Sequence, residues 1–426
     1  MKFPSADHET PSRRSFAALR HPSARIYLLG SAMAMMADNI EHVISYWVIF
    51  HKFHSPALGG FAVISHWLPF LLFSFFSGAL ADRYDPRRLV QLGMVLFMAV
   101  SVCWGYLIFT DTLEMWHAAV LLIIHGSAGV FWGPAGQMLI HDIVGTEQLQ
   151  SGVRMLATSR KLGILLGPAI GGGMMLLVGP AMGLLINVLI YLPLTIWLWK
   201  APYGRKSTDD KEIGQPPRSL RGFTDILPTL RSVAGNPTIF SMILLAGAAS
   251  LFIGNAHQAQ MPEFTRDLGF GQSGFYYSVL LAANAAGAVI AGFVLESGNL
   301  LEAKPKTAFL LVLIWCCAIG GFAASTSYPL SVSLLFIAGF LNLAYSSMAQ
   351  TLVQLNAPAE QRGRVIGLYN MSSLGMMTFS GLFVGVGGSF IGIHWSLGLS
   401  AAALAATSAL LMMYALARLQ AARPVS

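Results

Sequence analysis

The chain has 426 residues, of which 55% are hydrophobic and only 11% are charged, and its mean hydropathy is +0.62. Soluble proteins carry about 25% charged residues, so this composition excludes an ordinary soluble protein and indicates a polytopic membrane protein. The formal net charge of +7 does not indicate nucleic-acid binding, because Lys and Arg follow the loop pattern of a membrane protein. Cys103, Cys316 and Cys317 fall in apolar segments, so we expect no disulfide framework.

Residues 1–24 are polar and lack the apolar core and cleavage site of a signal peptide, so we expect a cytoplasmic tail. Twelve apolar runs of about 20 residues follow, and this length crosses the core of a bilayer. They lie near residues 26–50, 57–81, 88–110, 116–140, 156–178, 181–200, 238–260, 274–296, 307–326, 329–353, 366–389 and 394–418. The fifth and sixth runs are divided by a tight turn at Gly179-Pro180.

A polar stretch at residues 201–237 separates the first six runs from the last six. We expect this linker, with a short surface helix near Leu220–Val233, to join two halves at residues 25–200 and 238–419, followed by a cytoplasmic tail at 420–426. Residues 137–147 and 350–360 align weakly at half the chain length, which favours duplication. The predicted fold is an all-α polytopic membrane protein with twelve transmembrane helices in two pseudo-symmetric six-helix halves.

The basic residues indicate the orientation of the chain. If both termini are cytoplasmic, the outer loops hold only Lys52 and Arg266, and all other Lys and Arg residues lie in tails, inner loops or cytoplasmic helix ends. Because Lys and Arg concentrate in cytoplasmic loops, we predict that both termini are cytoplasmic.

A polar patch interrupts the first span. Asp38, Glu41, His42 and Ser45 share one helical face through i,i+3 and i,i+4 spacings. An ionised Asp near the membrane centre costs roughly 2.5–3.5 kcal/mol on insertion scales, so such groups usually mark a transport pathway. We predict that this face lines a transport cavity and that Asp38, Glu41 and His42 carry coupling protons. The alternative for each is a structural hydrogen-bond network.

Candidate substrate contacts come from polar and aromatic side chains in other spans. The seventh span is the repeat counterpart of the first, and aromatic side chains can line an amphipathic pocket. The predicted substrate-binding residues are Trp67, Trp132, Asn255, His257, Gln258 and Tyr276. The aromatic residues have an alternative role in packing, and isolated polar residues such as His66 and His125 are expected to hydrogen-bond between helices.

The loop between the second and third spans carries a motif in which a glycine is followed by an acid and basic residues. Its residues are Gly78, Asp82, Arg83, Arg87 and Arg88. Gly78 permits close helix contact, and Asp82 can accept from an Arg or cap a helix N-terminus. The motif resembles the signature inner loop of the major facilitator superfamily.

The fifth span carries Gly163, Gly167, Pro168 and Gly171, which resemble the antiporter motif of superfamily exporters. We expect these small residues to pack the helix against its counterpart across the interface of the halves, with Pro168 bending it. This motif favours export over uptake.

Residues 354–369 resemble the siderophore and drug exporter branch of the same superfamily. The resemblance implies a monomer in a bacterial inner membrane that exports small amphipathic molecules against a proton gradient by alternating access. The branch carries an acid in the first span, which Asp38 matches. Phe131-Trp132-Gly133-Pro134 stands where many drug exporters carry a relay arginine, so that relay is missing here.

The predicted function is proton-coupled export of a small amphipathic molecule such as a siderophore or drug. The expected partners are that substrate, protons and the bilayer, without nucleic acid or a cofactor. One alternative is a divalent metal transporter that uses Asp38, His42 and His257, and another is a lipid or lysolipid flippase. An enzyme is not expected, because the sequence shows no catalytic set or nucleotide loop.

Overall fold

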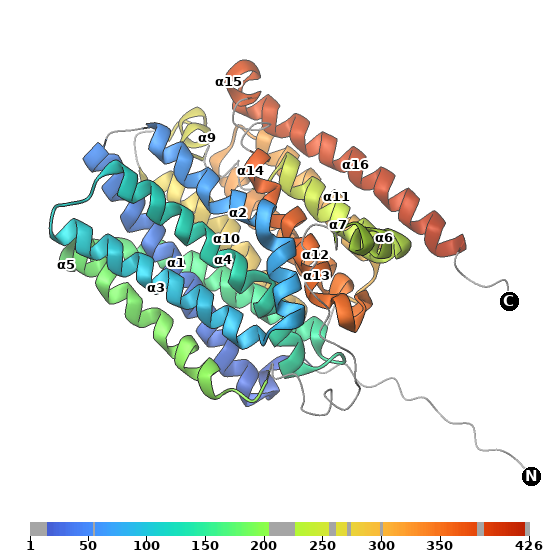
Figure 1. Cartoon of the computed structure of the whole chain (residues 1–426). Helices are drawn as coiled ribbons and strands as arrows, with labels where there is room; N and C mark the ends of the chain where they lie inside the picture. The colour runs from blue at the N-terminus through green and yellow to red at the C-terminus, as the bar shows by residue number, and fades with distance from the viewer. Residues whose placement is uncertain are drawn as a thin grey trace, which may run out of the picture.

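A computed structural model describes residues 15–53, 56–203, 226–254, 261–270, 274–298, 301–380 and 387–421. Within these residues the chain is a bundle of helices without strands (Figure 1). The first half begins with a short turn of helix, η1 (Ala17–Arg20). It continues with α1 (Pro22–Phe53), α2 (Pro56–Arg83), α3 (Pro86–Phe109), α4 (Met115–Val144) and α5 (Leu149–Lys200).

The second half follows a short helix, α6 (Ile226–Gly235), at the end of the predicted linker. Its elements are α7 (Pro237–Phe252), α9 (Met261–Asp267), α10 (Gly274–Gly298), α11 (Pro305–Ala324), α12 (Tyr328–Asn356), η4 (Ala359–Gln361), α13 (Arg362–Asn370), a π-helical turn η5 (Met371–Gly375), α14 (Met377–Ser380), α15 (Gly387–Ile391) and α16 (Ile393–Ala421). The predicted eleventh span is therefore a broken one, because a π turn interrupts it between α13 and α14.

Helix α5 contains two of the predicted spans. Gly179 has a φ of 79°, a conformation that favours glycine, and Pro180 follows it. The chain therefore turns there, as the sequence predicted. Helical dihedral angles continue through Pro168.

Eight of the described helices are long and apolar enough to cross a membrane, with α5 counted once. Helix α1 is not among them, because Asp38, Asn39, Glu41 and His42 lower its hydropathy. Together with the turn in α5, the element order gives six spanning segments on either side of the linker. The predicted fold class is confirmed.

The small residues of α5 pack within the first half. A Cβ at Gly163 would lie 2.5 Å from the carbonyl oxygen of Ala32, and one at Gly167 would lie 2.5 Å from the Cβ of Asn39. A Cβ at Gly171 would approach the Cα of Ile40 to 3.2 Å. The expectation that this motif packs across the interface of the halves is therefore wrong, because its glycine face lies against α1.

The two halves meet tightly at one end of the bundle, where α2 and α10 end and α5 and α13 begin. We call this the terminal end, because α1 begins and α16 ends on the same side (Figure 1). Here the Asp82 carboxylate accepts from the backbone N–H groups of Gly363 at 2.5 Å and Arg364 at 3.0 Å, and from Nε of Arg364 at 3.2 Å. Asp82 therefore both caps a helix and pairs with an arginine.

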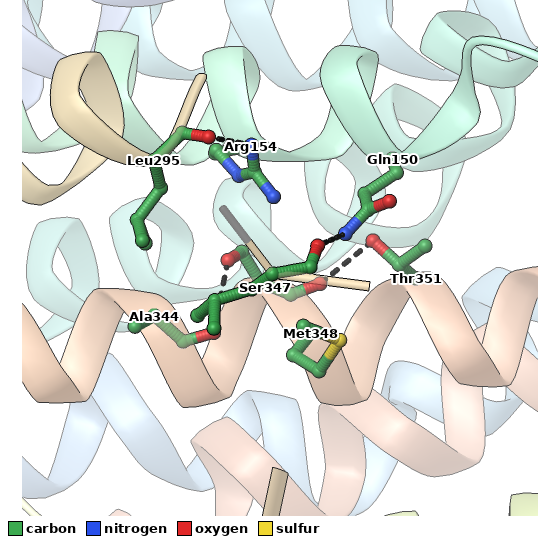
Figure 2. Close-up of a pocket in the computed structure, with 8 residues that line it drawn as sticks. Gln150, Arg154, Leu295, Ala344, Ser347, Met348 and Thr351 are labelled. Carbon is green, nitrogen blue, oxygen red and sulfur yellow. Dashed lines mark hydrogen bonds between the residues drawn. The ribbon is translucent and has the colours of Figure 1, made fainter. Parts of the chain in front are cut away.

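A second contact between the halves at the terminal end joins α10 of the second half to α5 of the first. We call this contact and the one made by Asp82 the two latches. Nη1 of Arg154 lies 3.0 Å from Oε2 of Glu296 and donates to the carbonyl of Leu295 at 2.6 Å. Ser151 donates to the other oxygen of Glu296. Figure 2 shows Arg154 and Gln150 of α5 facing Ser347 and Thr351 of α12 across a small pocket between the halves. Both latches hold the terminal end closed.

The basic residues of the loop motif stabilise the turn between α2 and α3. Arg87 is buried, lies 2.6 Å from the Asp85 carboxylate, and donates to the carbonyl of Ala201. Asp85 also caps α3 by accepting from the backbone N–H of Arg87. Arg83 lies over the ring of Tyr84, and Arg88 lies over Trp199. Of the motif's charged residues, Asp82 makes the contact between the halves.

Candidate transport site

One imidazole in the first half connects the two acids of α1. Nε2 of His125, from α4, lies 2.9 Å from Oδ1 of Asp38, and its Nδ1 lies 2.7 Å from Oε1 of Glu41. All three side chains are buried. The sequence places them there because Asp38 and Glu41 are one helical turn apart on α1, so a single ring on the facing helix can reach both.

Neighbouring helices complete the surroundings of this bridge. Ser101 of α3 donates to the second oxygen of Glu41. Asn187 of α5 donates to the carbonyl of Ala37 at 2.9 Å and lies 3.4 Å from the Ser101 hydroxyl. Phe97 packs edge-on against the His125 ring at 4.8 Å between centroids. These contacts fix the position of the imidazole and of Glu41.

Two further imidazoles form the more accessible side of the cluster. Nδ1 of His42 lies 3.6 Å from Oδ2 of Asp38, and the His42 side chain is 18% exposed against 2% for Glu41. The rings of His66 and His125 each lie 4.7 Å from that of His42. We name the five residues Asp38, Glu41, His42, His66 and His125 the titratable cluster.

The geometry of the bridge constrains its protons. A neutral imidazole has one donor and one acceptor nitrogen, whereas a carboxylate only accepts. Nδ1 of His125 is hydrogen-bonded to Glu41, whereas Nε2 lies within ion-pair distance of Asp38 without a hydrogen bond, so an imidazolium or one protonated acid is the arrangement that keeps a ring lone pair away from a carboxylate. An imidazolium between two carboxylates leaves one negative charge in a buried place, where unpaired charge is expensive. A further proton would neutralise it.

The structure changes the sequence-based picture of this region in two respects. The predicted polar face of α1 does not open directly on a space between the halves, because Asp38, Glu41 and Ser45 are buried inside the first half. His125, which was expected only to hydrogen-bond between helices, is the residue that connects the two acids. The missing signal was the pairing of α1 with α4, which one sequence does not specify.

The three predicted substrate residues that the structure describes do not form one group. Trp67 is half-buried against His66, with ring centroids 4.5 Å apart, so it borders the titratable cluster. Trp132 is buried beside Arg160. Tyr276 lies at the start of α10 in a separate aromatic group with Phe270 and Tyr328. The remaining predictions, Asn255, His257 and Gln258, lie outside the described residues.

Sequence reasoning missed two positions that the structure makes prominent. Arg154 forms the buried pair with Glu296, and a search for a basic partner of that acid would have found it. Arg160 lies deeper in α5, with its guanidinium 4.7 Å from the centre of the Trp132 ring. The sequence showed Arg160 inside an apolar run, and this was the available signal.

Comparison with known proteins identifies the family of the chain. The family model described as Major Facilitator Superfamily matches residues 27–381. Macrolide efflux protein A of Streptococcus pyogenes is 22% identical over 377 residues, which cover 86% of this chain and 90% of that protein. The enterobactin exporter EntS of Shigella flexneri is 24% identical over 313 residues, which cover 70% of this chain and 68% of EntS.

Solved structures share the fold at low identity. The outward conformation of the transporter FucP gives a TM-score of 0.72 at 10% identity, covering 92% of this chain and 98% of that one. The human organic anion transporter MFSD10 gives 0.68 at 14% identity, covering 91% of this chain and 98% of that one. The helical bundle, the family match and these neighbours agree that the chain is a transporter belonging to the Major Facilitator Superfamily.

Proposed function

We propose that the protein is a proton-coupled exporter of a small amphipathic organic molecule and that the titratable cluster carries the coupling proton. The observation that supports this most strongly is the bridge in which His125 contacts both Asp38 and Glu41. A buried group of two acids and an imidazole can hold either one or two protons with a small rearrangement. It is therefore suited to bind and release a proton during a transport cycle.

His42 provides the route by which the proton reaches the bridge. It is more exposed than Asp38 and lies 3.6 Å from the Asp38 carboxylate, so an imidazole can pass a proton between water and the buried acid. One proton moving down a membrane potential of ~100 mV supplies ~2.3 kcal/mol. That free energy can drive the substrate outward without ATP.

The terminal latches supply the conformational part of the proposal. With the terminal end assigned to the cytoplasm, as the loop charges indicate, this structure is closed on the cytoplasmic side. Opening it requires breaking the contacts of Asp82 and the Arg154–Glu296 pair. The cycle then alternates between access from either side as the two halves rock. The names of the efflux relatives support export.

The test uses inverted membrane vesicles in which respiration acidifies the interior and quenches the dye ACMA. A panel of amphipathic organic molecules is added, and a transported molecule reverses the quenching because protons leave in exchange. We expect reversal with the wild-type protein and at least a tenfold smaller signal with Asp38→Asn.

The matched control is Asp111→Asn, which removes an acid whose side chain is 92% exposed between α3 and α4. It should respond as the wild type does. Full activity of Asp38→Asn at equal membrane abundance would exclude Asp38 as the proton carrier.

A second candidate function is transport of a divalent transition-metal cation. The ligand atoms of His42, His66 and His125 all lie within 4.8 Å of one another, and Asp38 adjoins two of these rings. Nitrogen ligands with one carboxylate suit Zn²⁺, Co²⁺ or Ni²⁺. Of the predicted ligands Asp38, His42 and His257, the first two belong to this group, and His257 lies outside the described residues. No contact of the described residues bears on the lipid or lysolipid alternative.

Cobalt distinguishes the two candidates, since a tetrahedral Co²⁺ complex absorbs strongly in the visible range. If the protein transports a metal, micromolar Co²⁺ should give this band in the purified protein, and His66→Gln should remove it. Membrane vesicles that contain the protein should also accumulate the metal. A proton carrier without a metal function gives neither the band nor the accumulation.

A further inference from the structure

A group of hydrogen-bond donors without acceptors lies between the titratable cluster and the terminal end. Within the described residues, Nε and Nη2 of Arg160, Nε1 of Trp132 and Nδ2 of Asn370 are buried and have no hydrogen-bond partner. Trp132 is 4% exposed and Asn370 is 1% exposed. Buried donors are rarely left unpaired, so each such group needs an explanation.

These donors converge on one segment of α4. A Cβ added at Gly136 would lie 3.1 Å from Nη2 of Arg160 and 3.3 Å from Cδ1 of Trp132, the ring atom bonded to Nε1. A Cβ added at Gly133, one helical turn earlier, would lie 3.0 Å from Nδ2 of Asn370. The absence of side chains at the two glycines lets these donors, which come from α4, α5 and α13, pack directly against α4. The group therefore spans both halves.

The charge of this group is not compensated by the protein. Within the described part of the chain, no carboxylate lies within ion-pair distance of Arg160. Its guanidinium instead lies over the ring face of Trp132. The next residue, Lys161, likewise has no acid partner there. An uncompensated buried cation is strongly unfavourable, and a cation surrounded by further donors requires an acceptor. A planar guanidinium matches a carboxylate or another oxyanion.

We propose that Arg160, Trp132 and Asn370 form a receptor for the anionic end of the transported molecule, which makes the substrate an amphipath bearing a carboxylate or similar oxyanion. This proposal rests on the proposed function and names its substrate class. Trp132 supplies both an aromatic surface for the apolar part and an N–H donor. Asn370 reaches the same region from the other half, so bound substrate contacts both moving parts.

The proposed receptor lies apart from the residues that carry the coupling proton. Gly167 packs against Asn39, beside Asp38, and Arg160 lies roughly 10 Å along α5 from Gly167 toward the terminal end. The anion and the coupling proton therefore occupy separate places in the first half.

The test measures equilibrium binding to the purified full-length protein in phosphatidylcholine nanodiscs by calorimetry, with no gradient present. The probes are 2-naphthoate, neutral 2-naphthamide and 2-naphthylmethylammonium, which share one apolar body. We expect naphthoate to bind at least tenfold more tightly than the other two. Arg160→Met should abolish that preference, and Arg160→Lys should retain part of it because the charge remains without the planar fork.

Two further variants keep the test decisive. Arg266→Met removes a cation that is 66% exposed and paired with Glu263, and it should leave the preference unchanged. Asn370→Ala removes one donor but no charge, so naphthoate affinity should fall about threefold while ammonium binding stays the same. This variant remains informative if Arg160→Met does not fold.

Several results would overturn the proposal. These are an absence of naphthoate binding, equal affinity for the three probes, or an undiminished preference in Arg160→Met. A nanodisc series with phosphatidylglycerol tests a lipid headgroup as the occupant. If that lipid weakens naphthoate binding to the wild type but not to Arg160→Met, the site belongs to lipid and the assignment to substrate fails. Because no proton gradient is used, these outcomes are independent of the vesicle test of Asp38.

Discussion

The two halves of the transporter share one architecture, but in the part of the chain that the structure describes they differ in the charge of their first and fourth segments. Its first and fourth segments, α1 and α4, bring together Asp38, Glu41, His42 and His125. The corresponding segments of the second half, α7 and α12, contain no Asp, Glu, Lys, Arg or His. Their surroundings are apolar and aromatic, for example the stacked rings of Trp315 and Tyr345 at 5.3 Å.

The difference indicates a division of labour within a duplicated fold. The second half has one continuous apolar core, whereas two separate apolar clusters lie in the first half. A charged side chain buried between helices needs specific ion-pair or hydrogen-bond partners. We therefore expect the first half to be more sensitive to single substitutions. At the terminal end, by contrast, each half contributes one acid to the latches.

The largest expected effect is the removal of the central imidazole. His125→Leu leaves two buried carboxylates uncompensated, and breaking a buried pair in this way costs about 3–5 kcal/mol. We expect a large fall in melting temperature and loss of proton-coupled transport. The double variant Glu41→Gln/His125→Leu should recover much of the thermal stability but not the transport, because one of the uncompensated charges is gone.

The counterpart in the second half is Ser250→Ala in α7, which removes a hydrogen bond to the carbonyl of Ser373. A single neutral hydrogen bond contributes roughly 1 kcal/mol, so we expect a small stability change and retained coupling. Equal losses of transport in Ser250→Ala and His125→Leu would contradict the division between the halves.

The next effect concerns the latches. Glu296→Gln leaves the buried Arg154 without its carboxylate, so the closed terminal end should lose about 3–5 kcal/mol. Asp82→Asn should have a smaller effect, because an amide oxygen still accepts from the backbone of Gly363. A cysteine at Ser347, in the pocket of Figure 2, reports the opening when the native cysteines are replaced.

We expect maleimide to label this cysteine at least tenfold faster in Glu296→Gln than in the parent, and to a lesser degree in Asp82→Asn. Identical labelling rates in the parent and both variants would show that these acids do not hold the terminal end closed.

A smaller difference is expected at the glycines that precede the latch acids. A Cβ at Gly78 would lie 2.1 Å from the carbonyl oxygen of Gly363, whereas one at Gly292 would lie 1.7 Å from the hydroxyl of Thr158. The Cβ of Thr158 would also lie 2.6 Å from the added atom, so rotation of the Thr158 side chain does not relieve this contact, but replacement of Thr158 by Gly does. Gly78→Ala and Gly292→Ala should therefore each destabilise by about 1–3 kcal/mol, and Gly292→Ala/Thr158→Gly by less. Thermal melting of the three variants measures this order, and the reverse order would contradict it.

The smallest effect is expected at the surface of the first half. A hydrogen bond from Lys52 at 2.6 Å lowers the pKa of Asp111. A lowered folded-state pKa adds stability at pH values above the unfolded pKa, and this contribution is lost as pH falls through the folded pKa. Because Asp111 is exposed, its replacement by Asn should change neither transport nor the melting temperature at neutral pH measurably. A large change in either would show that this pair has a structural role.

The fold was largely predictable, because runs of apolar residues, the linker and the turn at Gly179-Pro180 are local features of the sequence. Asp82 was predictable as a residue that pairs or caps, and it does both. The partners were not predictable. His125 lies far from Asp38 in sequence, and the glycines of α5 could pack on either neighbour. The donors around Arg160 come from three helices, so only their arrangement in space reveals that they lack an acceptor.

If the titratable cluster holds an exchangeable proton, infrared difference spectroscopy of the purified protein between acidic and alkaline pH detects it without knowledge of the substrate. We expect a carboxylic acid C=O band that appears on acidification and is lost in Asp38→Asn or Glu41→Gln. A spectrum that neither substitution alters would mean that the cluster stays in one protonation state and serves only the structure.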